Sequence, residues 1–415
     1  MIKAIKGTRD ILPPASNAWN HVEATVRRTF AQFNYQEIRT PIFEETALFA
    51  RGVGAETDIV TKEMYSFPDR DGESITLRPE NTAGVIRSYI EHRLDQIPGT
   101  QKLYYIGPMF RRERPQKGRY RQFFQIGAEA IGSHEPAVDA EVIEMIAVLF
   151  ERLGVKGYRL LVNSVGDGDC RPPYIEALRV ALQGVKEKLS PDNRRRAETN
   201  PLRVLDSKEP QDEPIIAALP NIHDYLNEAC KAHFAAVCRY LDDRGIAYEV
   251  TPRLVRGLDY YTHTTFEFLH GALGAQNAIC GGGRYNGLAE SIGSRVPAPG
   301  VGFSIGEDRL LMAVEESGTA IPAHRIDVYV APVGEDAFRH ASKLARALRQ
   351  AGAVVELAPA GKLKRAMELA NKLGARYALL VGDNEIAAGA YALKDMASGE
   401  QFSVTGEELL KRIRA

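Results

Sequence analysis

The chain has 415 residues, and at roughly 150 residues per domain this length predicts two or three domains. Hydrophobic residues make up 44% and charged residues 26%, a composition typical of a globular protein that can bury a core without disulfides. The 53 Lys and Arg nearly cancel the 54 Asp and Glu, so the net charge of −1 argues against a generally basic coat for DNA or membrane surfaces.

The cysteines and the N-terminal residues indicate the cellular compartment in which the protein is located. Four cysteines form no CxxC pair and have no His at zinc-ligand spacing, so we expect reduced thiols: Cys170, Cys230, Cys238 and Cys280. Residues 1–7 lack the apolar core of a signal peptide, and no run approaches the ~18 apolar residues of a membrane span. We therefore expect a cytoplasmic protein with no membrane partner.

The first part of the chain predicts two helices with paired strands between them. Apolar residues at helical spacing predict a helix with one buried face: Trp19, Val22, Val26, Phe30 and Phe33. Strands are predicted at 35–43, in a hairpin at 64–67 and 74–77, and in a pair at 102–110 and 120–131. Residues 137–152 predict a second amphipathic helix.

The second part of the chain predicts an insertion and then a separate domain. Residues 170–245 lack strand signals and are expected to be helical, with polar breaks at 190–200 and 207–213. Strand signals return at 246–250, 264–269, 276–281 and 299–305, before a helix at 306–316. Beyond turn residues near 317–322, strand and helix patterns alternate to the end, which predicts an α/β domain with a mixed sheet.

A strongly cationic stretch lies between the strands predicted at 102–110 and 120–131. Residues 111–121 hold six cations and one carboxylate, a local net charge of +5. A solvated hairpin loop is one interpretation. The other is a nucleotide-phosphate site, because guanidinium groups match phosphate oxygens and the neighbouring Tyr120 and Phe123 offer flat faces for a base.

Two further segments indicate a lined pocket. Residues 253–262 combine Arg256 and Asp259 with Tyr260 and Tyr261 within a few positions. The glycine-rich stretch 280–285 fits neither GxGxxG nor a P-loop, so close backbone approach to a ligand is its expected role. Neither HExxH nor GxSxG occurs in the sequence.

Together, these segments resemble the class II aminoacyl-tRNA synthetases and, within them, the histidyl-tRNA synthetase family. The resembling motifs are KGTRD (6–10), Pro41 for motif 1, FRRE (110–113) for motif 2, GFSIGEDRL (302–310) for motif 3, and the histidine signatures RGLDYYT (256–262) and GGRY (282–285). The resemblance covers the whole chain, and the two histidine signatures are its most specific part.

The resemblance implies a three-part fold and a homodimer. The α+β catalytic core is expected to hold a six-stranded antiparallel sheet with flanking helices, made by residues 1–169 and 246–318. A helical insertion would span 170–245, and an α/β anticodon-binding domain would span 325–415.

The resemblance also implies ATP-dependent ligation of L-histidine to tRNA(His) through a histidyl-adenylate, with AMP and diphosphate released. Arg111 and Arg256 would be catalytic and flank the α-phosphate, Arg256 taking a place where other class II members often use a metal. The other expected ATP contacts are Arg119 and Arg309 with the β- and γ-phosphates, Glu113 with the adenine amino group, and Phe123 with the adenine ring. Mg²⁺ is expected with the phosphate oxygens, and no protein side chain is assigned to it.

The expected histidine site pairs both ends of the substrate. Glu80 and Thr82 would receive the α-ammonium group, and Gln125 would contact the carboxylate. Glu129 and Tyr261 would bond the imidazole nitrogens. Tyr260 and Tyr285 would close the pocket, and Arg256 would also contact histidine. Three residues depart from the expected motifs without removing an assigned side chain: Asn81, Asn286 and Asp308.

The C-terminal segment carries the predicted tRNA contacts. Residues 325–415 hold 14 Lys and Arg against 11 Asp and Glu, and Lys362, Lys364 and Arg365 open a predicted helix there. The alternative function is a non-catalytic, synthetase-like regulatory subunit of ATP phosphoribosyltransferase. Such proteins usually lose the catalytic arginine and the anticodon domain, whereas this sequence keeps Arg111, Arg256, Arg309 and a C-terminal domain.

Overall fold

The computed structural model describes residues 2–54, 57–116, 118–207, 209–273, 277–359 and 361–414. The chain divides into two compact units, Met1–Ile321 and Pro322–Ala415. Among the described residues, every helix is too short or too polar to span a bilayer.

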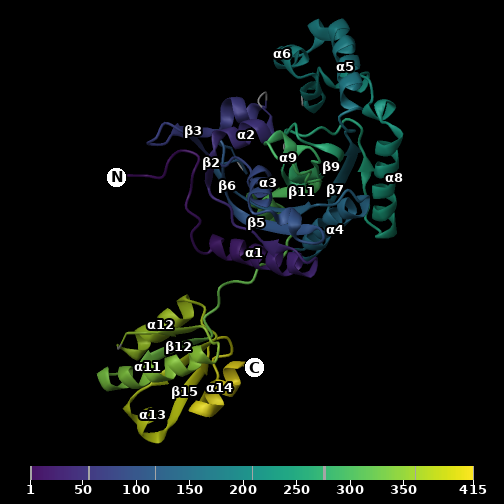
Figure 1. The fold of residues 1–415 in the computed structure, drawn as a ribbon. Helices are drawn as coiled ribbons and strands as arrows, with labels where there is room; N and C mark the ends of the chain where they lie inside the picture. The colour runs from purple at the N-terminus through teal and green to yellow at the C-terminus, as the bar shows by residue number, and fades with distance from the viewer. Residues whose placement is uncertain are drawn as a thin grey trace. The chain divides into compact units, whose positions relative to one another are not determined.

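A large sheet is the centre of the first unit (Figure 1). In the described ranges its strands follow the order β1 (Gln36–Glu37), β5 (Gln101–Phe110), β6 (Gln122–Ile131), β11 (Gly300–Gly306), β10 (Ala278–Arg284), β9 (Thr262–His270), β7 (Tyr158–Ser164), β8 (Glu249–Val250). The six strands from β5 to β7 run antiparallel, and only the two-residue edge strands β1 and β8 add parallel pairs. The six-stranded antiparallel sheet expected from the sequence is therefore confirmed as the centre of this sheet.

Strand alternation gives the sheet two different faces. Ile126, Ala128 and Ala130 of β6 lie in the main hydrophobic core, while Gln125 and Glu129, at the alternate positions of the strand, face the opposite side. A strand in which polar residues alternate with apolar ones in this way can close a core on one face and line a site on the other.

Helices cover both faces. The main core is closed by α1 (Ala15–Gln32), α4 (Pro136–Arg152), α8 (Glu228–Asp243) and α10 (Glu307–Glu316). Trp19, Val22, Val26 and Phe30 of α1 are buried, which confirms the predicted helix and its buried face. The other face carries α2 (Thr46–Val53), α3 (Thr82–Glu91) and α9 (Leu288–Ser291).

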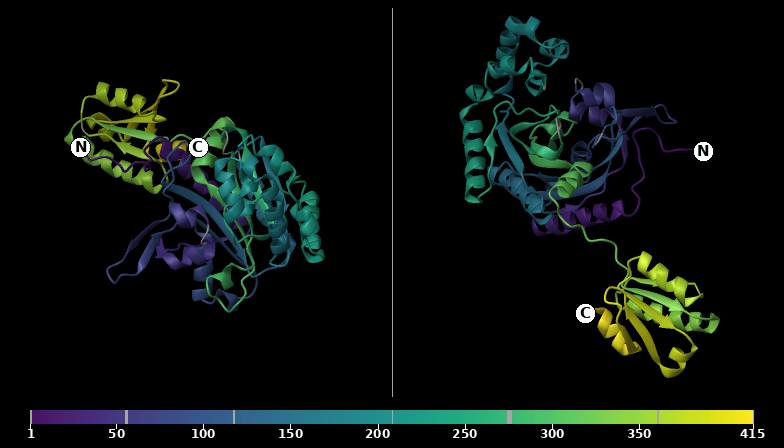
Figure 2. Two further views of the ribbon diagram at one scale, coloured as in Figure 1. Left: turned by 90° about the horizontal axis from the view of Figure 1, so that it is seen from above. Right: turned by 180° about the vertical axis from the view of Figure 1, so that it is seen from behind.

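A small sheet and the insertion complete the first unit. The strands β2 (Phe43–Glu45), β4 (Ser74–Leu77) and β3 (Tyr65–Pro68) form an antiparallel sheet that includes the predicted hairpin. The insertion contains α5 (Arg171–Val185), α6 (Pro191–Thr199) and α7 (Glu213–Ala217), which surround a separate hydrophobic cluster. In Figures 1 and 2 these helices stand together beyond the β7 side of the sheet.

The insertion differs from its sequence prediction at one segment. Residues 190–200 were expected to be a polar break, but most of them form α6. The sequence has little apolar periodicity here, so no helix was predicted. Polar contacts hold the helix instead: Asp212 accepts hydrogen bonds from the Ser190 hydroxyl at 2.7 Å and the Asn193 amide at 2.5 Å. Val237 and Leu241 of α8 belong to the main core, so the insertion's own cluster reaches only to Cys230.

The second unit has its own mixed sheet, as predicted. In the described part of this unit the strands follow the order β13 (Val355–Leu357), β12 (Val328–Pro332), β14 (Tyr377–Val381), β15 (Ala390–Asp395), β16 (Gln401–Thr405). The pairs that β12 makes are parallel, and the other two pairs are antiparallel. Its helices are α11 (Glu335–Gln350), α12 (Leu363–Lys372), α13 (Asp383–Ala388) and α14 (Gly406–Arg414).

Candidate active site

A cavity of about 910 Å³ opens in the first unit between the polar face of the large sheet and the insertion. Of the site residues predicted for this unit, the following line it: Glu80, Thr82, Arg111, Glu113, Arg119, Phe123, Gln125, Arg256, Tyr260, Tyr261, Tyr285 and Arg309. Glu129 does not line the cavity and is fully buried behind it. The sequence segments that carry these residues, far apart along the chain, therefore meet at one cavity.

Arg111 and Arg119 come from the two sides of the β5–β6 hairpin. The Arg111 Nε atom donates to the carbonyl of Pro79 at 2.9 Å, and its guanidinium lies 5.2 Å from the centre of the Phe123 ring. Arg119 Nη1 donates to Glu113 Oε2 at 2.8 Å. These contacts orient both guanidinium groups before any ligand arrives. Lys117, counted among the cations of this loop, lies outside the described residues.

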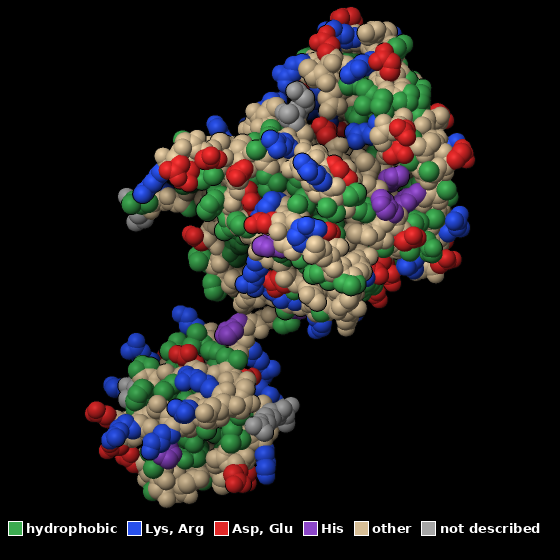
Figure 3. All heavy atoms as spheres, in the orientation of Figure 1, with side chains coloured by type: hydrophobic (Ala, Val, Ile, Leu, Met, Phe, Trp, Pro, Cys, Tyr) green, Lys and Arg blue, Asp and Glu red, His purple; other side chains and the backbone are tan. Residues whose placement is uncertain are grey.

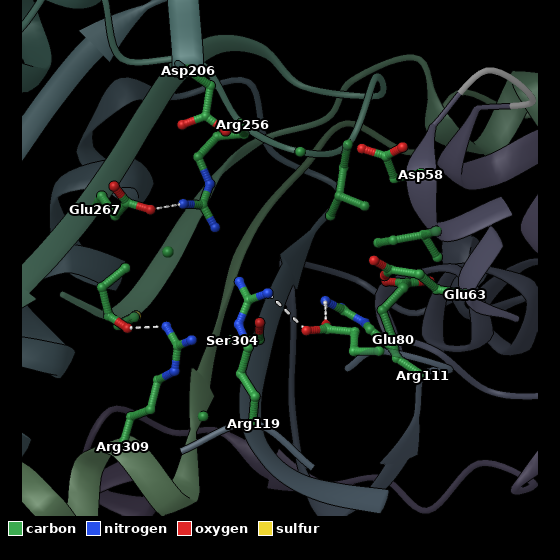
Figure 4. Close-up of a pocket in the computed structure, with 18 of the residues that line it drawn as sticks. Asp58, Glu63, Glu80, Arg111, Arg119, Asp206, Arg256, Glu267, Ser304 and Arg309 are labelled. Atoms are coloured by element: carbon green, nitrogen blue, oxygen red, sulfur yellow. Dashed lines mark hydrogen bonds and ion pairs between the residues drawn. The ribbon is translucent and has the colours of Figure 1, made fainter. Parts of the chain in front are cut away.

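Arg256 and Arg309 approach the same space from the other end (Figure 4). Arg256 forms an ion pair with Glu267 of β9, and Arg309 Nη1 donates to the carbonyl of Ala278 at 2.8 Å. A Cβ atom at Gly281 would lie 2.1 Å from the Arg256 guanidinium, so the glycine-rich strand provides the space that this arginine occupies. Although burial opposes the charge of Arg256, the neighbouring Glu267 raises its pKa.

Electrostatic conditions around the arginines are those of an anion site. Burial lowers the pKa of Arg309, and the nearby cation Arg119 lowers it further. Figure 4 shows Arg111, Arg119, Arg256 and Arg309 directed toward one space. Like charges gathered in this way are stabilised when a polyanion such as a phosphate chain neutralises them.

Glu80 and Glu129 are buried carboxyl groups with different partners. The two Glu80 oxygens accept from the backbone N–H groups of Thr82 at 2.8 Å and Ala83 at 3.1 Å, at the start of α3. Glu129 accepts from the Thr82 hydroxyl at 2.8 Å and the Tyr285 hydroxyl at 2.5 Å. Burial raises the pKa of Glu129 to about 8, although both hydroxyl donors favour its charged form.

The space for Glu129 depends on a glycine in the facing strand. A Cβ atom at Gly302 of β11 would lie 1.8 Å from Glu129 Oε2. Glu129 and Gly302 are direct partners in the β6–β11 ladder, so only glycine allows this carboxyl group to lie flat between the strands.

Aromatic rings and one amide complete this end of the cavity. The Tyr260 and Tyr261 ring centres lie 4.8 Å apart, and the Tyr260 and Tyr285 centres lie 5.9 Å apart. Gln125 donates from Nε2 to Ser304 at 3.3 Å. Its buried Oε1 atom has no hydrogen-bond partner among the described residues, so this amide oxygen is available to a ligand.

Several cavity residues were missed by the sequence analysis. Glu267, which orients Arg256, lies in a predicted strand without any motif around it. Residues of the insertion also reach the cavity: Asn193, Arg196, Arg203 and Asp206. Arg203 Nη2 donates to the carbonyl of Gly257 at 3.0 Å, which connects the insertion to the RGLDYYT segment. The density of charged residues at 192–209 is the one sequence signal that could have indicated a role for these residues.

The three residues that depart from the expected motifs each have a hydrogen-bond or ion-pair partner nearby. Asn81 Oδ1 accepts from the Thr40 hydroxyl at 2.6 Å, and Asn286 Oδ1 accepts from Arg284 at 3.3 Å. Asp308 forms an ion pair with Arg9, whose guanidinium lies 4.1 Å from the centre of the Tyr120 ring. The N-terminal KGTRD segment is thereby held against the hairpin and motif 3.

The predicted tRNA contacts lie in the second unit. Lys362, Lys364 and Arg365 are exposed at the beginning of α12. On the visible face of this unit, several Lys and Arg side chains lie among acidic and hydrophobic ones (Figure 3).

Comparisons with known proteins match both units. The family model for histidyl-tRNA synthetase matches residues 7–310, and the model for the anticodon binding domain matches residues 327–415. The chain is 67% identical over 415 residues to the histidine–tRNA ligase of Solibacter usitatus, with 100% of this chain and 99% of that protein covered. It is 58% identical over 426 residues to the histidine–tRNA ligase of Koribacter versatilis, covering 100% and 96%.

The chain is also similar in structure to solved proteins of related description. The apo histidyl-tRNA synthetase of S. aureus is 40% identical, covers 100% of both chains and superposes with a TM-score of 0.84. A Bacillus halodurans protein described as an ATP phosphoribosyltransferase regulatory subunit/histidyl-tRNA synthetase is 21% identical, with a TM-score of 0.67 and coverage of 92% of this chain and 98% of that chain. At that identity the likeness concerns the fold alone.

Proposed function

This chain belongs to the histidyl-tRNA synthetase family, and from that premise we propose that its cavity joins L-histidine to tRNA(His) with the use of ATP. The histidine carboxylate attacks the α-phosphorus of ATP, diphosphate leaves, and histidyl-adenylate forms. The terminal ribose hydroxyl of the tRNA then attacks the carbonyl carbon of the adenylate, and AMP leaves. The observation that carries the proposal is the convergence of four oriented arginines with a polar, tyrosine-lined pocket in one cavity.

We propose that the arginines stabilise phosphate charge. Negative charge grows on the α-phosphate oxygens during the first step, and Arg111 and Arg256 would flank them. Their anchoring to Pro79 and Glu267 supports this role, because fixed donors need no reorganisation when the charge develops. The β- and γ-phosphates would meet Arg119 and Arg309.

The adenine and histidine ends would be read by other side chains. Glu113 would accept from the adenine amino group and Phe123 would face the ring. Glu80 and Thr82 would hold the α-ammonium group of histidine, and Gln125 would contact its carboxylate through an N–H of Nε2. Tyr261 would bond the imidazole, and Tyr260 and Tyr285 would close the pocket. The direct imidazole contact expected of Glu129 is replaced by an indirect role, because Glu129 is fully buried behind the cavity. Glu129 would serve histidine recognition by fixing the hydroxyl groups of Thr82 and Tyr285 at the cavity wall. Sites that pair polar groups in this way strongly reject analogues without them.

Mg²⁺ is proposed as a companion of ATP, where it neutralises phosphate charge. Within the described part of the chain, no group of three His, Cys, Asp or Glu ligand atoms converges in this cavity. Two of the carboxylates that line the cavity, Glu113 and Glu267, are already paired with arginines. We assign no protein side chain to the ion, which would be held by the phosphates of ATP.

The contact with tRNA, the homodimer and the cellular location are also proposals. The second unit, with Lys362, Lys364 and Arg365 on α12, would contact tRNA(His). The family resemblance further supports a cytoplasmic homodimer with neither DNA nor membrane as a partner.

Aminoacylation tests the proposal against the regulatory alternative. The purified chain is incubated with ATP, Mg²⁺, labelled histidine and tRNA(His) transcript, and labelled tRNA is counted. We expect charging that requires ATP and that phenylalanine cannot replace. A chain that folds and binds histidine but leaves the transcript uncharged would support the regulatory subunit instead.

A further inference from the structure

Two cysteines and an aspartate converge where the chain enters and leaves the insertion. Cys170 directly precedes α5, the first insertion helix, and Cys230 lies in the first turn of α8, through which the chain returns to the core. Their Sγ atoms lie 3.8 Å apart, although 60 residues separate them in sequence. The ligand atoms of Asp167, Cys170 and Cys230 all lie within 4.8 Å of one another.

Two of the distances in this cluster are those expected between ligands of one tetrahedral ion. With Zn–S bonds of about 2.3 Å, two thiolates on one zinc ion lie about 3.8 Å apart. A thiolate and an imidazole nitrogen on that ion lie about 3.5 Å apart, given a Zn–N bond of about 2.0 Å. The two cysteines match the first distance, and Cys230 Sγ lies 3.6 Å from His263 Nδ1, which is close to the second.

A neighbouring residue orients all three groups. The backbone N–H of Asn227 donates to Cys170 Sγ at 3.2 Å, and its side-chain amide donates to Asp167 Oδ2 at 2.9 Å. Its Oδ1 atom accepts from the backbone N–H of Cys230 at 2.8 Å. Metal ligands are commonly fixed by such outer hydrogen bonds, which set their direction and basicity.

We propose that Asp167, Cys170 and Cys230 bind one Zn²⁺ ion and that His263, which lies beside Cys230 but outside this three-residue cluster, closes on the ion as the fourth ligand. Sulfur, nitrogen and carboxylate oxygen are the donors that zinc takes in proteins, and each thiol would release its proton to solvent on binding. The site is separate from the ATP-bound Mg²⁺ proposed above and needs no open position for substrate.

The ion would fasten the two ends of the insertion to each other and to the core. Arg171, next to Cys170, donates to the carbonyls of Asp259 at 3.1 Å and Tyr261 at 3.0 Å, both in the RGLDYYT segment. His263 lies two residues after Tyr261. A filled zinc site would thus hold the backbone that carries the histidine-pocket tyrosines.

Cobalt titration of the full-length chain tests this proposal without relying on activity. The protein is reduced, freed of metal and titrated with Co²⁺, whose bonds to thiolates give a charge-transfer absorption. We expect the absorption to saturate at one Co²⁺ per chain and to disappear when one equivalent of Zn²⁺ is added. Cys230→Ser removes one of the two thiolates and should lower the absorption at saturation by half or more, and Asp167→Asn should weaken Co²⁺ binding at least tenfold.

Cys238→Ser is the matched control, because Cys238 lies on the same helix α8 but outside the cluster. This variant should keep the full absorption. A reduced wild-type chain that gives no thiolate-to-cobalt absorption overturns the proposal, as does an absorption that Cys230→Ser leaves undiminished. The wild-type titration needs no variant, so it decides the question even when Cys230→Ser fails to fold.

Discussion

At the scale of single residues, Glu129 makes the stability of the first unit depend on pH. Burial raises its pKa from 4.5 to about 8, so the folded state binds the proton more tightly than the unfolded state. The stability that this group contributes is complete below pH 4.5 and is lost as the pH rises through 8. The loss amounts to roughly 1.4 kcal/mol for each pH unit between the two pKa values.

Glu129→Gln removes this titration and should flatten the pH dependence. Urea unfolding is followed by the fluorescence of Trp19, the single tryptophan, in the absence of ligands. Between pH 5.5 and 7.5, the free energy of unfolding of the wild type should fall relative to that of the variant. Parallel pH profiles for the two proteins would show that the carboxyl group of Glu129 titrates in its ordinary range.

Arg256 should matter for chemistry far more than for folding. Removal of a fixed donor to transition-state charge typically costs about 10²–10³ in kcat, so Arg256→Ala should slow histidine-dependent ATP–pyrophosphate exchange by that factor. Its elution in size-exclusion chromatography should match the wild type. Arg114→Ala is the control, because Arg114 lies in the same cationic loop but is exposed and does not line the cavity. Equal losses in both variants would contradict the role given to Arg256.

At the scale of elements, a buried ion pair joins α4 to β10. Asp139 and Arg284 are both fully buried, and the Arg284 Nε atom lies 3.1 Å from Asp139 Oδ2. Asp139→Leu would leave a buried guanidinium without its carboxylate and should lower the free energy of unfolding by about 3–5 kcal/mol. Urea unfolding measures this change. Glu249→Gln, which breaks the exposed pair with Arg159, should have little effect, and equal effects would contradict the account.

Helix α12 provides the test of tRNA contact. Lys364→Glu should weaken tRNA(His) aminoacylation, chiefly through the KM for tRNA, and should leave ATP–pyrophosphate exchange unchanged. The effect should shrink at high salt, because contacts to phosphate are screened. Lys343→Glu on α11 makes the same change of charge at another exposed lysine and serves as control. A loss of exchange activity by Lys364→Glu would contradict a role confined to RNA.

Elements with strong periodicity could be predicted from the sequence, and those held by polar or distant contacts could not. The spacing of apolar residues predicted α1 and α4, and turn residues predicted the β3–β4 hairpin. Strand β7 was missed although glycines that are typical of turns flank it, Gly157 before it and Gly166 and Gly168 after it. Helix α6 was missed because Asp212, rather than an apolar face, holds it.

The residues of the candidate site differ in the same way: those in local motifs could be predicted, and those that depend on contacts between distant segments could not. The motifs predicted the arginines and tyrosines, because those residues are close together in short sequence segments. Glu267 and the pairing of Cys170 with Cys230 depend on which strands and helices become neighbours, and no local pattern carries that information. The burial of Glu129 behind the cavity likewise depends on Gly302 in a facing strand.

At the scale of the whole molecule, the net charge of −1 conceals how the charges are distributed. Residues 111–121 hold a net charge of +5, and their described arginines include two that line the cavity, Arg111 and Arg119. The second unit carries its own sheet, its own hydrophobic clusters and the exposed cations of α12. A near-neutral sum is therefore compatible with nucleotide and RNA partners, because each contact depends on local charge.

ATP–pyrophosphate exchange with each of the twenty amino acids in turn tests the central claim most directly. The assay needs only the purified chain, ATP, Mg²⁺ and labelled pyrophosphate, so it reports amino-acid activation alone. The account predicts that histidine supports rapid exchange and that the other nineteen amino acids do not. Absence of exchange with histidine, or faster exchange with another amino acid, would contradict it.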